Sequence, residues 1–259
     1  MPGDFLNITL IQPNIVWENK EANLAAYEQM IAAAPNKEIV ILPEMFSTGF
    51  SMAPEKLAEP MSGTSVQWMK DMAHRYRCII TGSLIIEEEG KYYNRLLWVQ
   101  PDGKLGQYDK RHLFAYAGED KHYSPGDTRL IAQVKGWKIC LMVCYDLRFP
   151  VWARNYDAAY DVLIYVANWP ERRSLAWKTL LQARAIENMS YVAGVNRVGD
   201  DGNGIHYNGD SSVFGPLGEK LWQHGAETAV HTITLDKQKL DEARGHFPFL
   251  NDADKFMIV

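Results

Sequence analysis

Several segments of this chain are apolar at every position over the length of a strand. The clearest cases are Ile39-Val40-Ile41-Leu42 and Leu163-Ile164-Tyr165-Val166. Neither shows the alternation of apolar and polar residues that is typical of a strand with one solvent-exposed face. Continuous apolar runs are typical of strands that are covered on both faces. Because helical patterns separate these runs, the sequence predicts a layered α/β fold with mixed sheets, whose connectivity the pattern leaves open.

Runs between turn residues place the elements along the chain. Helical periodicity occurs at about 21–33, 62–77, 149–156 and 174–189, with Ser174 as a candidate N-cap of the last helix. No repeat and no Pro/Gly/Ser-rich linker divides the chain, so we expect one domain over residues 1–259. Strands are expected at about 5–12, 38–43, 78–86, 92–100, 105–110, 129–134, 137–144, 161–167, 190–196, 211–215, 218–223 and 229–235.

The charge balance restricts the class of partner. Lys plus Arg number 27 and Asp plus Glu number 32, for a net charge of −5, and no long basic cluster is present, so we expect no nucleic-acid partner. The longest apolar runs are far shorter than the roughly 20 residues of a membrane span, so we expect no membrane association. The first residues, MPGDFLNITLIQ, lack the basic flank and long apolar region of an export signal, which predicts a cytoplasmic protein.

Cysteine and histidine spacing argues against a disulfide framework and a metal site. The three cysteines include no C-x-x-C pair, and the seven histidines include no H-x-x-x-H pair. The acidic loop 199–204 lacks the spacing and final glutamate of a calcium-binding EF-hand. We therefore expect free thiols, no bound metal, and a hairpin turn or a loop at the edge of a site over 199–204.

Three predicted strands end in residues that carry chemistry. Glu44 follows the apolar run 39–42, Lys110 follows the strand at 105–108, and Cys144 ends the strand at 137–143. A partly buried carboxylate can act as a general base, and a lysine can stabilise an oxyanion. A cysteine at a strand-to-helix bend, near free N–H groups, is favoured as a thiolate. Since strand ends can converge in one crevice, the sequence predicts one active site from these residues.

Each of these residues also has an ordinary structural interpretation. Glu44 could cap a turn, and Lys110 could lie in a solvated turn with a surface ion pair. Cys144 could be a buried structural cysteine, as we expect for Cys78 and Cys140, which lie inside apolar runs.

The same segments resemble the three signature regions of the nitrilase superfamily of carbon-nitrogen hydrolases. The resemblance extends over nearly the whole chain, in the family's order and spacing, and is greatest for the omega-amidase branch and its YafV-like bacterial members. It implies a four-layer αββα sandwich with mixed sheets, a homodimer, and an active site without metal or cofactor. The matching stretches are Leu42–Phe46, Tyr108–Phe114 and Val143–Pro150, with further similarity in Ser124–Asp127, Ala167–Pro170 and Ala183–Asn188.

The resemblance also implies catalytic roles. Cys144 would attack an amide carbon, and Lys110 with the N–H of Tyr145 would hold the oxyanion. Glu44 would help to deprotonate Cys144 and later activate the water that hydrolyses the thioester. A second glutamate, Glu119, would position Lys110 or the substrate amide. The alternative for Glu119 is a surface carboxylate in a flexible loop.

The omega-amidase branch implies a small dicarboxylic acid monoamide as substrate, such as 2-oxoglutaramate or 2-oxosuccinamate, hydrolysed to the acid and ammonia. Its distal carboxylate needs a cation, for which arginine is well suited. Arg148, Arg172 and Arg173 are the candidates, with a structural ion pair as the alternative for Arg148.

Two other interpretations of the whole protein stay open. One is an amidase of another specificity on the same scaffold, acting on deaminated glutathione or a carbamoyl compound. The other is a catalytically silent binding protein on this fold. Phe46, Tyr145 and Trp169 are candidate pocket residues in any of these cases, with plain packing as their alternative.

Overall fold

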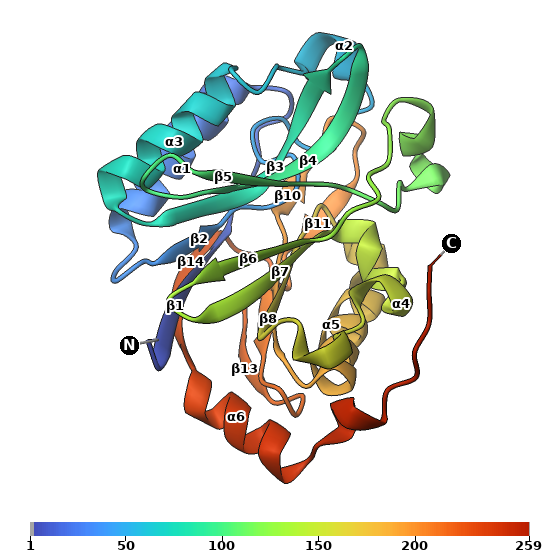
Figure 1. Cartoon of the computed structure of the whole chain (residues 1–259). Helices are drawn as coiled ribbons and strands as arrows, with labels where there is room; N and C mark the ends of the chain where they lie inside the picture. The colour runs from blue at the N-terminus through green and yellow to red at the C-terminus, as the bar shows by residue number, and fades with distance from the viewer. Residues whose placement is uncertain (1–2, 259) are drawn as a thin grey trace.

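Residues 3–258 are described by the computed structural model, in which two six-stranded mixed sheets lie against each other (Figure 1). Within the first sheet β1, β2 and β3 are parallel, and within the second β7, β8 and β9 are parallel; the other neighbours are antiparallel. The first sheet has the order β14 (Ala229–Asp236), β1 (Phe5–Gln12), β2 (Ile39–Ile41), β3 (Ile79–Glu88), β4 (Lys91–Val99), β5 (Leu105–Asp109). The second has the order β13 (Lys220–Gln223), β12 (Ser212–Phe214), β9 (Tyr191–Val195), β8 (Val162–Val166), β7 (Trp137–Val143), β6 (Leu130–Val134).

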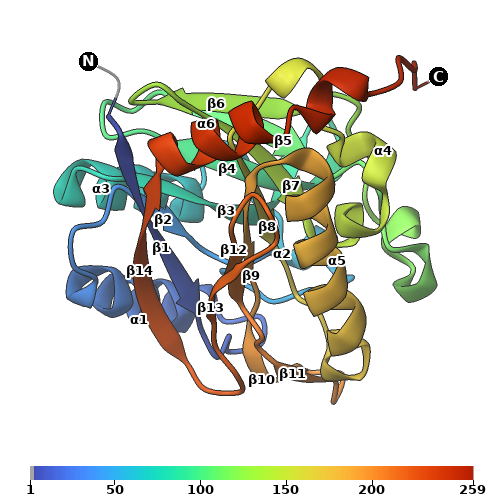
Figure 2. The same ribbon diagram turned by 90° about the horizontal axis from the view of Figure 1, so that it is seen from below.

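Helices cover the outer face of each sheet. α1 (Lys20–Ala33) and α3 (Thr64–Tyr76) pack on the first sheet, and α5 (Ser174–Asn188) packs on β9 and β12 of the second. Figure 2 shows the two sheets between these helices. The expected αββα sandwich with mixed sheets is confirmed. The shorter helical segments are α2 (Pro54–Leu57), α4 (Pro150–Ala153), α6 (Lys237–His246) and the 3-10 turns η1 (Ala115–Ala117), η2 (Glu119–Lys121), η3 (Cys144–Arg148), η4 (Tyr156–Ala158), η5 (Glu171–Arg173) and η6 (Phe249–Asp252).

These layers explain why the run from Ile39 to Leu42 is apolar at every position. Ile39 and Ile41 belong to the core between the two sheets, whereas Val40 and Leu42 belong to the core under α1 and α3. Successive side chains of a strand point to opposite faces. Both faces of β2 are therefore buried, and a polar side chain at any of its positions would destabilise the fold.

Most predicted elements are present, and the exceptions have physical causes. The helix expected over 149–156 is only α4, and Ser174 does not cap α5 because Arg173 holds the N-cap position and the Ser174 hydroxyl bonds to Asp210. α6 was not predicted because Leu240 and Ala243 are its only buried residues, too few to produce an apolar stripe. The hairpin of β10 (Val198–Asp200) and β11 (His206–Asn208) confirms the turn expected over 199–204.

Among residues 3–258, no helix combines the length and the apolar character that a membrane crossing requires.

Candidate active site

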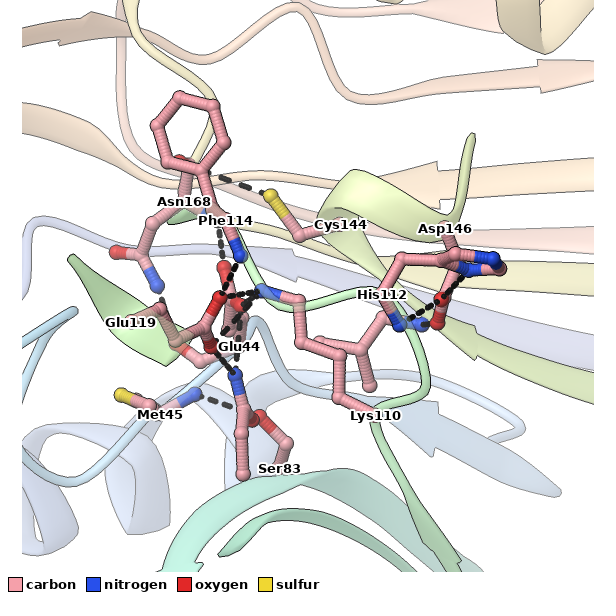
Figure 3. Close-up of polar contacts among 12 residues, drawn as sticks. Glu44, Met45, Ser83, Lys110, His112, Phe114, Glu119, Cys144, Asp146 and Asn168 are labelled. Carbon is pink, nitrogen blue, oxygen red and sulfur yellow. Dashed lines mark hydrogen bonds and ion pairs between the residues drawn. The ribbon is translucent and has the colours of Figure 1, made fainter. Parts of the chain in front are cut away.

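A buried ion cluster lies where β2 and β5 end. The Lys110 ammonium donates to Glu44 Oε1 at 2.8 Å and to Glu119 Oε2 at 2.8 Å, and none of the three side chains is exposed to solvent (Figure 3). The turn-capping interpretation of Glu44, the solvated-turn interpretation of Lys110 and the surface interpretation of Glu119 are therefore wrong. Burial alone would lower the pKa of Lys110, but the two carboxylates raise it above its ordinary value. Lys110 is consequently a permanent cation.

Glu44 is anchored by both sheets. Asn94 of β4 donates to Glu44 Oε1 at 2.8 Å, and the backbone N–H of Asn168, just beyond β8, donates to Glu44 Oε2 at 2.9 Å. The next residue, Met45, has a left-handed φ of 43° and its N–H donates to the Ser83 hydroxyl at 2.8 Å. This hydrogen bond helps to hold the sharp turn that directs Glu44 into the cluster.

Glu119 is held by η2 rather than by a strand. Its Oε2 accepts from the Phe114 N–H at 2.6 Å, and its Oε1 accepts from the Asn94 side chain at 3.1 Å. Burial raises the pKa of Glu119, Lys110 opposes this, and the like charge of Glu44 adds to it. A proton is therefore easier to place on Glu119 than on an exposed glutamate.

Cys144 begins η3 and faces the pocket beside the ion cluster. It is only partly buried, unlike Cys78 and Cys140, and its Sγ lies 3.9 Å from the carbonyl oxygen of Asn168. Its φ is 45°, a left-handed value that a non-glycine residue adopts only under constraint. All three cysteines are free, and the structural interpretation of Cys144 is wrong.

The expected thiolate character of Cys144 needs correction. Burial first, and the carboxylate of Glu44 second, raise the pKa of the thiol well above its ordinary value, and Lys110 only partly opposes them. η3 has five residues, too short to develop the dipole of a long helix. The shift therefore favours the neutral thiol over the thiolate.

A cavity of about 550 Å³ opens in front of Cys144. This volume lies within the range of small-molecule sites. Lys110, Cys144 and Asn168 contribute to its lining, together with Tyr145 and Trp169 as expected. Residues that the sequence did not single out also line it, among them Trp17, Phe50, Phe114, Asp201 and Tyr207.

All three candidate arginines line this pocket. Arg148 lies 5.1 Å from the ring centre of Trp169, and Arg173 lies 5.1 Å from that of Phe114. Among residues 3–258 none of the three has a carboxylate within ion-pair distance, so the structural ion pair considered for Arg148 is not found there. Burial, and then the neighbouring Arg172, lower the pKa of Arg173. An anionic ligand would relieve this uncompensated charge.

Phe46 is not a pocket residue. It is fully buried and packs against Tyr27 and Trp68, with ring centres 5.5 and 5.8 Å away, in the core under α1 and α3. The reason is its position after the left-handed Met45, which turns the chain so that Glu44 and Phe46 diverge.

Asn94 was missed because it lies inside a hairpin strand and has no motif around it. The available signal is a polar residue just before an apolar run, Leu96 to Val99, in a strand that also buries the charged Arg95. No group of three or more metal-ligating side chains is found in the part of the chain that the structure describes.

Residues 7–245 match the family described as carbon-nitrogen hydrolase. The chain belongs to the carbon-nitrogen hydrolase family. It is therefore placed among enzymes that hydrolyse amide and related carbon–nitrogen bonds, and the catalytically silent alternative is not favoured.

Two relatives indicate the branch of the family to which this hydrolase is similar. The chain is 46% identical to the omega-amidase YafV of Escherichia coli K12, covering 100% of both chains. It is 30% identical to the 2-oxoglutaramate amidase of Bacillus subtilis, over 96% of this chain and 97% of the relative. These two identities support the YafV-like branch within the family.

A solved structure supports the same placement of the hydrolase. The protein XC1258 of Xanthomonas campestris superposes with a TM-score of 0.96 at 44% identity, covering 98% of this chain and 99% of the other. It is described as a CN-hydrolase superfamily protein with an arsenic adduct in the active site.

Proposed function

We propose that this hydrolase is an omega-amidase, which hydrolyses the terminal amide of a small dicarboxylic acid monoamide such as 2-oxoglutaramate or 2-oxosuccinamate. The observation that carries the proposal is the buried Glu44–Lys110–Glu119 cluster beside Cys144, in a pocket that holds three arginines without ion-pair partners among residues 3–258. The omega-amidase and 2-oxoglutaramate amidase relatives support the same substrate class.

In the first half-reaction Glu44 accepts the proton of the Cys144 thiol as Sγ attacks the amide carbon. The carbonyl electron pair moves to oxygen, where Lys110 and the N–H of Tyr145 stabilise the negative charge. Glu44 then returns the proton to the amide nitrogen, and the carbon–nitrogen bond breaks. Ammonia departs, and the acyl group remains bound to Cys144 as a thioester. The raised pKa of the thiol makes the base indispensable.

In the second half-reaction water attacks the thioester. Glu44 accepts a proton from the water, a second tetrahedral intermediate forms, and the carbon–sulfur bond breaks. The sulfur recovers its proton, and the carboxylic acid is released. Glu119 acts as a positioning residue, because it contacts Lys110 through both carboxylate oxygens. The cycle uses no cofactor.

Arg173 is the first candidate to bind the distal carboxylate. It is less exposed than Arg148 and Arg172, so an ion pair there is screened less by solvent. Its guanidinium can hold a carboxylate through two parallel hydrogen bonds. Tyr145 and Trp169 would flank the substrate.

The proposal is tested by measuring ammonia release from 2-oxoglutaramate, glutamine, asparagine, succinamate and a simple nitrile. We expect preferential turnover of 2-oxoglutaramate by the wild type and none by Cys144→Ala. Preference for a carbamoyl compound or deaminated glutathione would assign another amide specificity. No turnover of any amide by the folded wild type would refute the assignment.

We further propose that the protein is one domain over residues 1–259 and works as a cytoplasmic homodimer without nucleic-acid or membrane partners. The family match over residues 7–245 supports one domain, and the net charge of −5 supports the absence of a nucleic-acid partner. Exposed apolar side chains on α5, Leu175 and Ile186, support a covered outer face.

A further inference from the structure

Asp146 is a buried carboxylate that the catalytic cluster does not include. It lies in η3, two residues beyond Cys144, and is fully buried. Its Oδ2 accepts from the Tyr108 hydroxyl at 2.7 Å and from the Val143 N–H at 3.0 Å. Its Oδ1 accepts from the His112 N–H at 3.1 Å and lies 2.8 Å from His112 Nδ1 (Figure 3). An ionised carboxylate only accepts, so Nδ1 carries the proton of the imidazole.

These contacts join the two sheets at the site. Tyr108 is the last but one residue of β5 in the first sheet, and His112 lies just beyond that strand. Together they bracket Lys110. Val143 ends β7 in the second sheet and directly precedes Cys144. One carboxylate thus binds both flanks of the lysine and the residue before the nucleophile.

The surroundings of Asp146 leave it little freedom. The Tyr108 hydroxyl accepts in turn from the Trp152 indole at 3.0 Å, and the His112 ring stacks on Phe149 with centres 3.7 Å apart. The bond from Asp146 back to the Val143 N–H is half of a capping box, which closes the first turn of η3. That turn contains Cys144 in its left-handed conformation.

We propose that Asp146 is a positioning residue, which fixes Cys144 Sγ relative to Lys110 Nζ by tying the end of β7 to both flanks of Lys110. The inference rests on the proposed function for its kinetic consequence, although the tie itself is independent of the substrate. A misplacement of about 1 Å at a reacting centre can lower a rate by about 100-fold.

The first variant is Asp146→Asn. Asparagine has the same shape, but one of its two terminal atoms is a donor, so two of the four donors around it lose their acceptor. We expect kcat for the best amide to fall about 10- to 100-fold. KM should stay within about threefold, because the hydrogen bonds of the Asp146 carboxylate go to Tyr108, His112 and Val143 and not to the arginines of the pocket. A kcat within about threefold of the wild type would overturn the proposal.

Asp161→Asn is the matched control. Asp161 is also a buried carboxylate with several donors, namely the Lys138 N–H at 2.9 Å, Lys237 and Arg244, but it lies at the opposite end of β7. We expect Asp161→Asn to lower the melting temperature while kcat stays within about threefold of the wild type. An equal loss of kcat in both variants would show a general effect of stability and overturn the proposal.

A milder variant covers the case in which Asp146→Asn does not fold. His112→Phe keeps an aromatic ring to stack on Phe149 and the backbone N–H, and removes the Nδ1 contact with Asp146. We expect kcat to fall about 2- to 10-fold with KM unchanged. An unchanged kcat together with a folded protein would contradict the proposal.

A readout without substrate separates this inference from the proposed function. In Asp146→Asn a displaced Lys110 favours the thiolate less, so alkylation of Cys144 by iodoacetamide at pH 8 should slow at least threefold, measured by mass spectrometry. Asp161→Asn should match the wild type. An equal or faster rate in Asp146→Asn would overturn the inference, whereas a wild type that hydrolyses no amide would overturn only the proposed function.

Discussion

Lys110 is the one cation shared by two buried carboxylates, those of Glu44 and Glu119. We expect Lys110→Met to lower the free energy of unfolding by about 3–5 kcal/mol at pH 7, because one partner of a buried ion cluster is removed. Turnover should fall at least 100-fold, since a lost oxyanion donor costs about 2.7–4 kcal/mol in the transition state. Denaturant unfolding and ammonia release measure the two effects.

The stability loss of Lys110→Met should depend on pH. Burial already raises the pKa of Glu119, and removing the cation raises it further, so the folded variant binds protons more tightly than the unfolded chain. Its unfolding free energy then falls as the pH rises through about 4.3, the ordinary glutamate value, and beyond. The loss should be smaller at pH 5 than at pH 7. Lys104→Met, which removes an exposed ion pair with Asp102, should change nothing measurable at either pH.

The Cys144 thiol should lose its proton only at a pH well above that of an ordinary cysteine. Because burial and Glu44 raise its pKa, the rate constant for iodoacetamide should climb about tenfold per pH unit from pH 6 to 9 without a plateau. Cys78 and Cys140 are buried, with pKa values raised to about 11 and 12, so one modification per chain is expected by mass spectrometry. A plateau near pH 7 would mean a stabilised thiolate and contradict the resting state described above.

Arg173 should affect binding of the anionic end of the substrate. Replacing it with alanine should raise KM for 2-oxoglutaramate about 10-fold or more, because a charge-assisted contact of about 1.5–3 kcal/mol is lost. A neutral monoamide of similar length should show no change. Arg172→Ala, at an exposed position of the same pocket, is the comparison, and a larger effect there would move the assignment to Arg172.

At the scale of elements, the connection from β5 to β6 sets the position of Lys110. The Gly126 N–H donates to the Lys110 carbonyl at 3.1 Å, and a Cβ on Gly126 would lie 2.3 Å from the Asp109 carbonyl oxygen. Backbone atoms cannot yield as a flexible side chain can. Glycine at this place therefore lets two loops approach closely beside the site.

Gly126→Ala should displace the segment that carries Lys110. We expect a loss of about 1–3 kcal/mol in unfolding free energy, as for other overpacked sites, and a fall in kcat of about 10-fold or more. Gly245→Ala in α6 is the control, because a Cβ there meets no atom within 4 Å and alanine favours helix. It should leave kcat unchanged. Wild-type kinetics for Gly126→Ala would show that this contact does not position Lys110.

At the scale of the whole molecule, the site exists only because two sheets meet. The first sheet supplies Glu44 and Lys110, and the second supplies Cys144. The core between the sheets is made of fully buried apolar side chains from both, such as Ile41 and Leu141. Closely packed side chains relax little, so the packing of the sandwich holds the separation of Glu44, Lys110 and Cys144.

The molecule should associate in solution. We expect light scattering at micromolar concentration to give twice the 29.5 kDa chain mass, because exposed apolar side chains on α5 and β13, such as Ile186 and Leu221, favour a covered face. A mass of one chain under these conditions would contradict the homodimer.

Much of this architecture could be predicted from the residues alone. The apolar runs predicted strands buried on both faces, and the strand ends predicted Glu44, Lys110 and Cys144, because strand patterns and turn residues are local signals. Glu119 came only from the family resemblance, since nothing local distinguishes it from a surface carboxylate. α6 escaped prediction because its helical state depends on the Asp236 cap more than on an apolar stripe.

The interactions among these residues could not be predicted before the fold was known. Asn94, Asp146 and Asn168 have partners far away in the chain, so spacing could not assign them. The pKa of Cys144 was misjudged for the same reason, because burial and Glu44 act through space. Local residue patterns were enough to predict most strands, the layered arrangement and the chemistry at three strand ends. The packing of the two sheets sets the distances among Glu44, Lys110 and Cys144 and the extent to which water is excluded from them. Both quantities depend on all the layers of the fold.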